Sequence, residues 1–531
     1  MDWWPIIAAV LAVLAVLYYR VTRNFDFFEK REIPYVKPMP FFGNMWEVII
    51  RRHSFPEVIG KIYNSNPESK YVGFFEFDTP LLVIRDLDLI KSITVKNFDH
   101  FPNHRLAFDP DLDPLFSKNL FSLRDERWKE VRNILTPAFT SSKMKSMFVL
   151  MRDCAKDYGD YFASLPADQS KEFELKDAFA KYTNDVIATC AFGVDVNSMK
   201  NPRNTFYLYG REATNFGAAQ ILRFLAVKNF PWLCRLLGIK AFKHKIIDFF
   251  EELVANTIKT RDENGIVRPD MIHLMMETRG KLGPGKELTI DDMTAQAFVF
   301  FIGGFESTST LMCFAAYEVG INDHVQKRLQ DEIDQVLEDC NGEVTYEAIN
   351  GMKYLDAVIL ESLRMYPSVV GSDRVCTKPF ELPPRVPGAE LYVVQPGDTV
   401  WIPISCIQHD PQYYPEPKKF NPDRFYDDSK LSNSLSFLSF GLGPRMCIGN
   451  RFALLEAKVL LFYIFANCDL APCAKSSKSL KLVSTGFAVV PENGFWLKIQ
   501  PRNAKRAQPE KIAIAGSTML IEKVLDRHSD N

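Results

Sequence analysis

The segment that decides the fold of this chain is FGLGPRMCIG, residues 440–449. It places Cys447 in a glycine-rich loop, with Arg445 two residues before it and a long apolar run after Asn450. Backbone N–H groups, a nearby cation and the start of a helix all stabilise a thiolate, and this segment offers all three. The glycines permit tight turns and a close approach of the backbone to a flat ligand. The loop therefore suits a thiolate that binds one face of a metal macrocycle.

These ten residues match the haem-binding signature of the cytochrome P-450 family, Phe-x-x-Gly-x-Arg-x-Cys-x-Gly, at every fixed position. The resemblance implies that Cys447 is the axial ligand of haem b iron, with Phe440 and Arg445 in the cofactor-binding loop. Thiolate ligation favours cleavage of the O–O bond. The alternative, an inert buried cysteine beside a turn, is the usual state of a free cysteine, but the surrounding pattern argues against it. A helix is expected over residues 450–466, with Gly449 or Asn450 near its N-cap.

Composition sets broad limits on the fold and the function. With 531 residues, the chain is expected to form two lobes or one unusually large domain. The 64 basic and 66 acidic residues nearly balance, so the global charge does not suggest nucleic acid as a partner. Ten cysteines without a CxxC pair argue against a disulfide scaffold or a zinc ribbon, and favour a reducing compartment.

The N-terminus carries the one membrane signal. The run WWPIIAAVLAVLAVLYY, residues 3–19, contains no charge, and as a helix it would reach about 25 Å. Basic residues follow it at Arg20, Arg23, Lys30 and Arg31, which predicts that the globular part stays on the cytoplasmic side. A cleaved signal peptide is the alternative, but in such a peptide the basic residues precede the apolar run. A retained anchor is therefore expected.

The expected domain organisation has four parts. They are a transmembrane signal anchor over residues 1–20, a proline-rich hinge over 21–44, a single large haem domain over 45–503 and a disordered tail over 504–531. Strands of a hairpin are expected at Tyr71–Phe77 and Leu81–Ile84, helices up to about residue 370, and short strands again at 380–404 and 480–497. The fold class predicted is mainly α with a smaller β-rich lobe, and the resemblance implies the cytochrome P-450 fold.

A second pattern consists of an acid and two arginines. Glu361 and Arg364 lie three residues apart on one helical face, where a solvated ion pair is the ordinary interpretation. Together with Arg424 in the segment NPDRF, they resemble the Glu-x-x-Arg and Pro-x-Arg-Phe elements of the family. The resemblance implies a structural triad that locks the core beneath the haem.

A third pattern lies in a predicted central helix that begins at Thr289, with Asp292 completing a capping box. Two glycines inside it, Gly303 and Gly304, cost about 1 kcal/mol each relative to alanine, so a compensating role is expected. Glu306 and Ser307 follow directly and resemble the catalytic acid–alcohol pair of the family, which relays protons. Here serine replaces the usual threonine. A kinked core helix with a polar face is the alternative.

Haem propionates require cationic partners, and the resemblance implies several. Trp128 and Arg132 share a helical face and match the Trp-x-x-x-Arg pattern of the family, and Arg445 precedes the thiolate. Arg374 and Arg105 occupy positions where related proteins often supply further contacts. An ordinary surface charge is the alternative for each arginine taken alone.

Two regions are expected to meet substrate. The candidate lining residues are Phe108, Phe116, Phe121, Phe301, Phe305, Val370 and Phe487, each of which has ordinary core packing as its alternative. Residues 221–242 interleave aromatic and basic side chains, which fits either contact with a membrane surface or a packed helix pair.

The resemblance, closest in texture to insect xenobiotic-metabolising microsomal members, implies an endoplasmic reticulum monooxygenase. It would insert one atom of O2 into lipophilic small molecules, either xenobiotics such as plant toxins and insecticides or endogenous lipids. The chain lacks a flavin or nicotinamide fingerprint, so the implied partner is NADPH–cytochrome P-450 reductase, with cytochrome b5 as a second partner and membrane lipids around the anchor. A haem-thiolate isomerase or dehydratase, or a non-enzymatic haem or lipophile-binding protein, is the alternative, and the Glu306–Ser307 pair argues against both.

Overall fold

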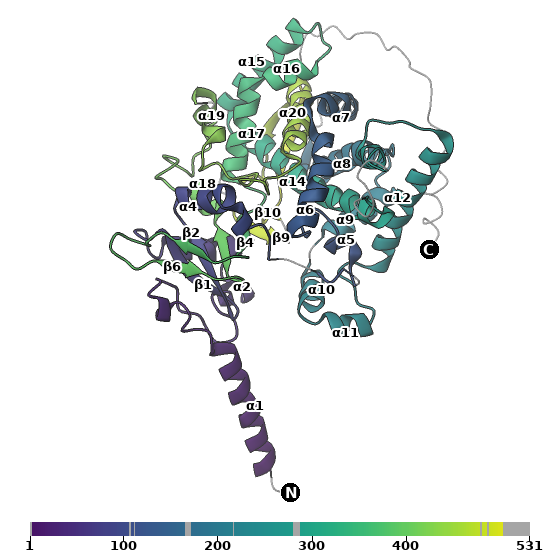
Figure 1. Ribbon diagram of the computed structural model, residues 1–531. Helices are drawn as coiled ribbons and strands as arrows, with labels where there is room; N and C mark the ends of the chain where they lie inside the picture. The colour runs from purple at the N-terminus through teal and green to yellow at the C-terminus, as the bar shows by residue number, and fades with distance from the viewer. Residues whose placement is uncertain are drawn as a thin grey trace. The chain divides into compact units, whose positions relative to one another are not determined.

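The computed structural model of the chain describes residues 3–105, 108–110, 112–164, 171–215, 217–279, 287–428, 430–477, 480–485 and 488–502. It is mainly helical with smaller sheets, which confirms the predicted fold class (Figure 1). The predicted tail at 504–531 and Phe487 lie outside the described residues.

Two compact units make up the structure. Unit 1 comprises Met1–Arg105, Val369–Lys419 and Asn433–Met446, and unit 2 comprises Leu106–Ser368, Phe420–Ser432 and Cys447–Asn531. The predicted domain boundaries stay a prediction.

Helix α1 (Trp4–Thr22) begins unit 1 and buries none of its residues. It is one of two helices in the described part of the chain that are long and apolar enough to cross a membrane. The other, α14 (Ile290–Ile321), is mostly buried, as expected for the core helix of a globular unit. The anchor predicted from the apolar run therefore coincides with a helix whose side chains have no protein core to pack against.

The core of unit 1 is a sheet with strand order β1-β2-β7-β4. Strands β1 (Tyr71–Glu76) and β2 (Thr79–Ile84) form the predicted antiparallel hairpin, with Tyr71 opposite Ile84. Strand β2 runs parallel to β7 (Thr399–Ile402), which pairs antiparallel with β4 (Ser372–Val375). Strand β4 lies before Phe380, where the sequence predicts that the strands begin again. It was not predicted because its sequence, SDRV, has no apolar run and only its pairing with β7 defines it as a strand.

The remaining elements of unit 1 are short. They are η1 (Glu29–Arg31), α2 (Trp46–Ile49), α3 (Phe55–Asn64), α4 (Leu87–Lys91), η2 (Ser92–Lys96), η3 (Phe98–His100), the paired strands β5 (Phe380–Leu382) and β6 (Tyr392–Val394), and α18 (Ile404–Gln408).

Unit 2 is built around α14, which begins as predicted. The Thr289 side chain accepts a hydrogen bond from the Asp292 N–H, and the Asp292 carboxylate accepts one from the Thr289 N–H. Its neighbours are α8 (Leu175–Ile187), α9 (Thr205–Thr214), α12 (His244–Asn264), α17 (Lys353–Met365) and α20 (Asn450–Asn467), as the labels in Figure 1 show. Side chains on nearly every face of α14 are buried because helices surround it.

Helix α20 begins at Asn450 with Gly449 as its N-cap, as predicted, and packs against α7 (Ser141–Ala163) and α14. The other helices of unit 2 are α5 (Pro114–Ser117), α6 (Asp125–Leu135), η4 (Thr136–Phe139), η5 (Ala188–Phe192), α10 (Ala218–Asn229), α11 (Pro231–Leu236), α13 (Met271–Met276), α15 (Asp323–Asp339), α16 (Tyr346–Gly351) and α19 (Asp423–Asp427). The short helix η6 (Leu431–Asn433) lies at its boundary.

Unit 2 also holds two small sheets. Strand β11 (Trp496–Pro501) pairs with both β3 (Lys171–Glu174) and β8 (Cys468–Pro472), and β9 (Leu482–Thr485) pairs with β10 (Ala488–Pro491). Strand β3 was not predicted, because its four residues carry no strand pattern and only their pairing with residues more than 300 positions away defines the strand.

Candidate active site

Two glycines in the signature loop adopt a backbone conformation that favours glycine. Gly441 and Gly443 have φ angles of 76° and 78°. A Cβ atom on Gly443 would collide with the carbonyl oxygen of Thr94, so the loop backbone packs directly against η2. The Met446 N–H closes the turn with a 2.9 Å bond to the Gly443 carbonyl. The glycine-rich spacing is therefore a steric requirement of this loop.

Cys447, the predicted iron ligand, is an exposed residue that lies just before α20, with its sulfur close to other protein groups. The surrounding protein desolvates the sulfur and raises its pKa, whereas the Gly449 N–H and the Arg132 guanidinium act in the opposite direction. Within the part of the chain that the structure describes, no three or more His, Cys, Asp or Glu residues gather in a metal-binding group. The Gly449 N–H and the Arg132 guanidinium both favour the thiolate, which is the form of cysteine that binds a metal.

Helix α6 carries the predicted Trp128 and Arg132. Trp128 is buried and Arg132 is half-buried one turn later. Burial lowers the pKa of Arg132, and the nearby Cys447 opposes this shift. Among the described residues, the Arg132 guanidinium makes no hydrogen bond or ion pair with a protein group, so its N–H donors are available to an anionic ligand.

Strand β4 places Arg374 in the interior of unit 1, where the residue is 2% exposed. Its Nη1 donates to the Ser372 hydroxyl at 3.0 Å and to the Asp373 carbonyl at 2.7 Å. Its Nε is buried without a hydrogen-bond partner, and burial lowers the pKa of the group to about 10. A buried donor left unpaired is costly, so this nitrogen fits an anionic group of a ligand.

The other two predicted cations of unit 1 make protein contacts. The Arg105 guanidinium pairs with the Glu76 carboxylate, and its backbone N–H donates to Asp373. Arg445 donates from Nε to the Pro102 carbonyl at 2.8 Å and approaches the Asn103 side chain at 3.4 Å. Arg445 therefore ties the signature loop to the segment that precedes Arg105.

The structure brings together the three residues of the predicted triad. Glu361 and Arg364 are completely buried on α17 and form two hydrogen bonds, of 2.7 and 2.9 Å. Arg424 Nε lies 3.4 Å from the same carboxylate, which also accepts the Asn421 N–H at 3.0 Å. The Glu361 carboxylate thus binds both arginines and a backbone N–H in the protein interior. The solvated ion pair that is the ordinary interpretation of this sequence pattern is therefore wrong here.

On α14, the Ser307 hydroxyl donates to the Gly303 carbonyl one turn earlier. Gly303 is exposed, and a Cβ atom there would meet nothing within 4 Å. Glu306 faces a different neighbour: its Oε1 lies 3.0 Å from Nζ of Lys176 on α8. In the described structure, no hydrogen bond joins the Glu306 carboxylate to the Ser307 hydroxyl. Sequence reasoning missed Lys176, because nothing local links residues that lie 130 positions apart.

The predicted lining residues fall into different surroundings. Phe108 and Phe116 are buried with ring centroids 4.8 Å apart. Phe301 is stacked on Phe305 and packs against other buried phenylalanine rings. Phe121 is 45% exposed and Val370 is half-buried. Phe301 therefore has the surroundings of a core residue, and the substrate assignment of the whole set stays a prediction.

Residues 221–242 include a helix pair, α10 and α11, with several apolar side chains that remain exposed. They are Ile221, Leu222, Leu225, Phe230, Trp232, Leu236 and Leu237. The segment therefore contains the helix pair considered from the sequence, and its contact with a membrane surface stays a prediction.

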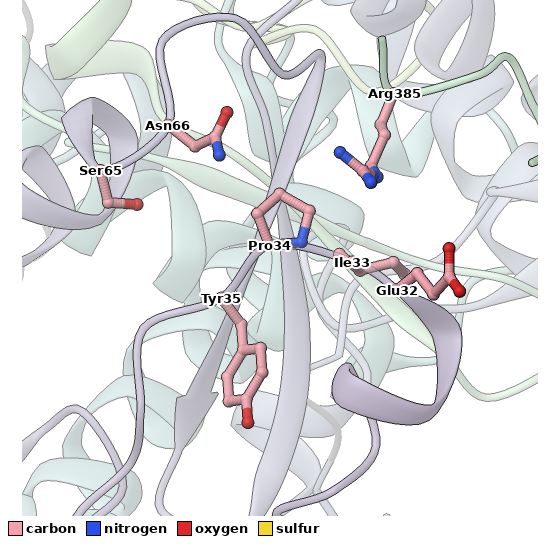
Figure 2. Close-up of a pocket in the computed structure, with 7 residues that line it drawn as sticks. All are labelled: Glu32, Ile33, Pro34, Tyr35, Ser65, Asn66 and Arg385. Carbon is pink, nitrogen blue, oxygen red and sulfur yellow. The ribbon is translucent and has the colours of Figure 1, made fainter. Parts of the chain in front are cut away.

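A cavity of about 400 Å³ lies in unit 1, away from every predicted site residue. It is lined by Glu32, Ile33, Pro34, Tyr35, Ser65, Asn66 and Arg385, and Figure 2 shows Pro34 between the side chains of Asn66 and Arg385. The backbone around it is fixed to the sheet, since the Gly73 N–H donates to the Pro34 carbonyl at 2.8 Å.

Comparison with known proteins gives consistent results. Residues 33–498 match the family model described as cytochrome P450. The chain is 45% identical over 527 residues to cytochrome P450 9e2 of Blattella germanica, covering 94% of this chain and 98% of that protein. It is 43% identical over 516 residues to probable cytochrome P450 9f2 of Drosophila melanogaster, covering 93% and 99%. A third relative, cytochrome P450 6j1 of Blattella germanica, is 34% identical over 499 residues, covering 94% and 98%.

Proposed function

The chain belongs to the cytochrome P450 family of haem monooxygenases, and we propose that it inserts one atom of O2 into lipophilic small molecules at the endoplasmic reticulum membrane. The observation that carries this proposal is the position of Cys447 in the family signature, close to Arg132, whose guanidinium makes no hydrogen bond with a described protein group. Bound haem would supply the oxygen chemistry, while the protein supplies the ligand, the protons and the orientation of the substrate.

In this proposal, Cys447 holds the iron of haem b. Arg132 and Arg374 serve the propionates, because each retains N–H donors that no described protein group uses. Trp128, Arg445 and Arg105 complete the set implied by the family pattern. Of these, Arg445 has the additional task of fixing the loop that carries Phe440.

The Glu361–Arg364–Arg424 triad is proposed to hold the core beneath the cofactor. Its acid accepts from a backbone N–H as well as from the arginines, so it fixes the segment that leads into α19 onto α17. A buried ion pair adds little net stability compared with apolar residues of the same size. Its directional hydrogen bonds are therefore proposed to serve mainly to fix one geometry of this segment.

Glu306 and Ser307 are proposed to supply protons during turnover. The Ser307 hydroxyl lies beside the open surface at Gly303, where a Cβ atom would meet no other group. A hydroxyl can accept a proton on one lone pair while it donates its own. This relay favours monooxygenation over the isomerase and lipophile-carrier alternatives, which require no such supply.

The proposed substrates are lipophilic xenobiotics or endogenous lipids. Electrons would come from NADPH through a membrane-bound cytochrome P-450 reductase, with cytochrome b5 as a second donor. The apolar side chains exposed on α10 and α11 support a role of that helix pair at the membrane surface, on the cytoplasmic side of an anchor formed by α1.

The carbon monoxide complex of the reduced, haem-loaded protein tests the ligand. We expect the red-shifted Soret band of thiolate-ligated haem in the native protein and in a Cys473→Ala control, and its loss in Cys447→Ala. Persistence of the band in Cys447→Ala would refute the assignment. NADPH consumption that requires both reductase and substrate, and yields an oxygenated product, would separate a monooxygenase from both alternatives.

A further inference from the structure

The cavity in unit 1 is lined by two charged side chains that pair with no opposite charge among the described residues. Arg385 is half-buried and Glu32 is exposed, and within the described structure neither side chain makes an ion pair or a hydrogen bond. The volume of about 400 Å³ lies in the range of small-molecule sites. The cavity therefore offers a ligand one cationic and one anionic contact.

The cationic contact is shared by an arginine and an amide. Figure 2 shows the side chains of Asn66 and Arg385 on either side of Pro34, pointing toward one another. The Asn66 side chain has no hydrogen-bond partner in the described part of the chain, although its backbone carbonyl accepts from Arg85 at 3.0 Å. The Arg385 backbone is held in place, because its carbonyl accepts the Lys70 N–H at 2.9 Å. A guanidinium and an amide N–H together suit the oxygens of a phosphate group.

The anionic contact comes from a residue whose backbone is fixed in an uncommon conformation. Glu32 directly follows η1 with a φ angle of 53° and a ψ angle of 27°, which is left-handed and rare for a residue other than glycine. Its N–H donates to the Glu29 carbonyl at 3.1 Å, and the Ile33 N–H donates to the Phe28 carbonyl at 3.0 Å. The turn thus holds the Glu32 carboxylate at the cavity, where it suits a primary ammonium group that donates hydrogen bonds.

The cavity also lies close to the proposed anchor along the chain. Helix α1 ends at Thr22, ten residues before Glu32. The backbone between them folds in hydrogen-bonded turns, such as Arg23 N–H to the Tyr19 carbonyl at 2.9 Å, so it spans less than the roughly 33 Å of an extended segment of this length. Phospholipid headgroups begin where the hydrocarbon core of a bilayer ends. Headgroups beside the end of α1 are therefore within reach of this cavity.

We propose that this cavity binds the zwitterionic headgroup of a membrane phospholipid, with the phosphate diester at Arg385 and Asn66 and the amine at Glu32. This inference rests on the proposed role of α1 as a membrane anchor and does not involve the haem. A bound headgroup would attach the sheet of unit 1 to the bilayer surface, because the Pro34 carbonyl at the cavity accepts the Gly73 N–H of β1 at 2.8 Å.

The test measures binding of dihexanoylphosphatidylethanolamine to the full-length, haem-loaded protein in an uncharged sugar detergent, by native mass spectrometry. We expect one tightly bound lipid in the native protein and in an Arg52→Gln control, which removes an exposed arginine of unit 1 that does not line the cavity. Arg385→Gln should weaken binding by about tenfold or more, because charge-assisted hydrogen bonds to the phosphate are lost. Unchanged binding in Arg385→Gln would overturn the proposal, as would an equal loss in Arg52→Gln.

Glu32→Gln supplies a second test that a general loss of folding cannot imitate. It should weaken binding of the same lipid by about tenfold and leave binding of dihexanoylphosphatidylglycerol, which has no amine, unchanged. Equal losses for the two lipids would refute the amine contact. Free glycerophosphoethanolamine carries the same phosphate and amine without acyl chains, and binding as tight as that of the lipid would overturn the assignment to a membrane component. The thiolate Soret band tests the proposed function separately, because it reports on Cys447.

Discussion

Substitution of Glu361 by glutamine offers the sharpest test of how the core of unit 2 is held. Glu361 and Arg364 are completely buried, and the carboxylate accepts two hydrogen bonds from the guanidinium. Arg424 depends on the same acid at 3.4 Å and is only 11% exposed. Glutamine keeps the shape of the side chain and removes the negative charge that both guanidinium groups contact.

The expected cost follows from the burial of the pair. Removing one partner of a buried ion pair typically destabilises a protein by about 3–5 kcal/mol, because the remaining charge stays desolvated. That range corresponds to a change of about 10² to 10⁴ in the folding equilibrium constant. The double substitution Glu361→Leu with Arg364→Met replaces both charges by apolar groups, and it should recover part of the loss, because Arg424 still loses its contact with the carboxylate.

Thermal unfolding of the haem-loaded protein, followed by circular dichroism and by the Soret band, measures this effect. The matched control is Glu347→Gln, which breaks an ion pair of 2.6 Å with Lys145 whose side chains are more than 60% exposed. Such a solvent-screened surface pair is expected to contribute little to stability. Equal midpoints for Glu361→Gln and Glu347→Gln would refute the reasoning, as would a double variant less stable than the single one.

Three further predictions concern other parts of the structure. Gly443→Ala should abolish haem binding, measured by the Soret absorbance, because the added Cβ would collide with the Thr94 carbonyl. Gly449→Ala is the control and should bind haem normally, because its Cβ would meet no atom closer than Phe139, at 3.7 Å. Arg374→Gln should weaken haem retention by about tenfold or more, because its buried Nε has no protein partner. Arg105→Gln should weaken it by less, because Arg105 already pairs with Glu76. Equal losses from the two variants in a haem-transfer assay would contradict this reasoning. Burial raises the pKa of Asp185 to about 6, above its value in an unfolded chain. The folded protein therefore binds this proton more tightly than the unfolded chain, so the free energy of unfolding should rise as pH falls from about 6 to about 4, by up to about 3 kcal/mol. In Asp185→Asn that part of the pH dependence of the free energy of unfolding should vanish, and its survival would show that another group is responsible.

Features set by local sequence were predicted well. The start of α14 follows from the Thr289 capping box, and the start of α20 follows from the glycine that precedes its apolar run. The β1–β2 hairpin follows from two apolar runs around a short turn. Each depends on neighbours within a few residues, so the pattern that forms the element is visible in the chain itself.

Features set by distant contacts were not predicted. Lys176 is an ordinary lysine in sequence, and only the packing of α8 on α14 brings it to Glu306. The pairing of Arg105 with Glu76 likewise depends on where the first sheet places the end of β1. Strand β4 carries polar residues and exists because β7 offers it an edge. In each case the partner lies far away in sequence and no spacing rule connects the two.

The attachment of Arg445 has a mechanical consequence for the cations of unit 1. Arg445 holds the Pro102 carbonyl, the adjacent Asn103 carbonyl accepts the Val375 N–H at 2.9 Å, and Val375 directly follows Arg374. One short backbone bridge thus couples the signature loop to the edge of the sheet. A displacement of β4 would be transmitted to Arg374 and Arg445 together, so substitutions in the sheet interior, such as at Val400, are expected to shift both arginine side chains in concert.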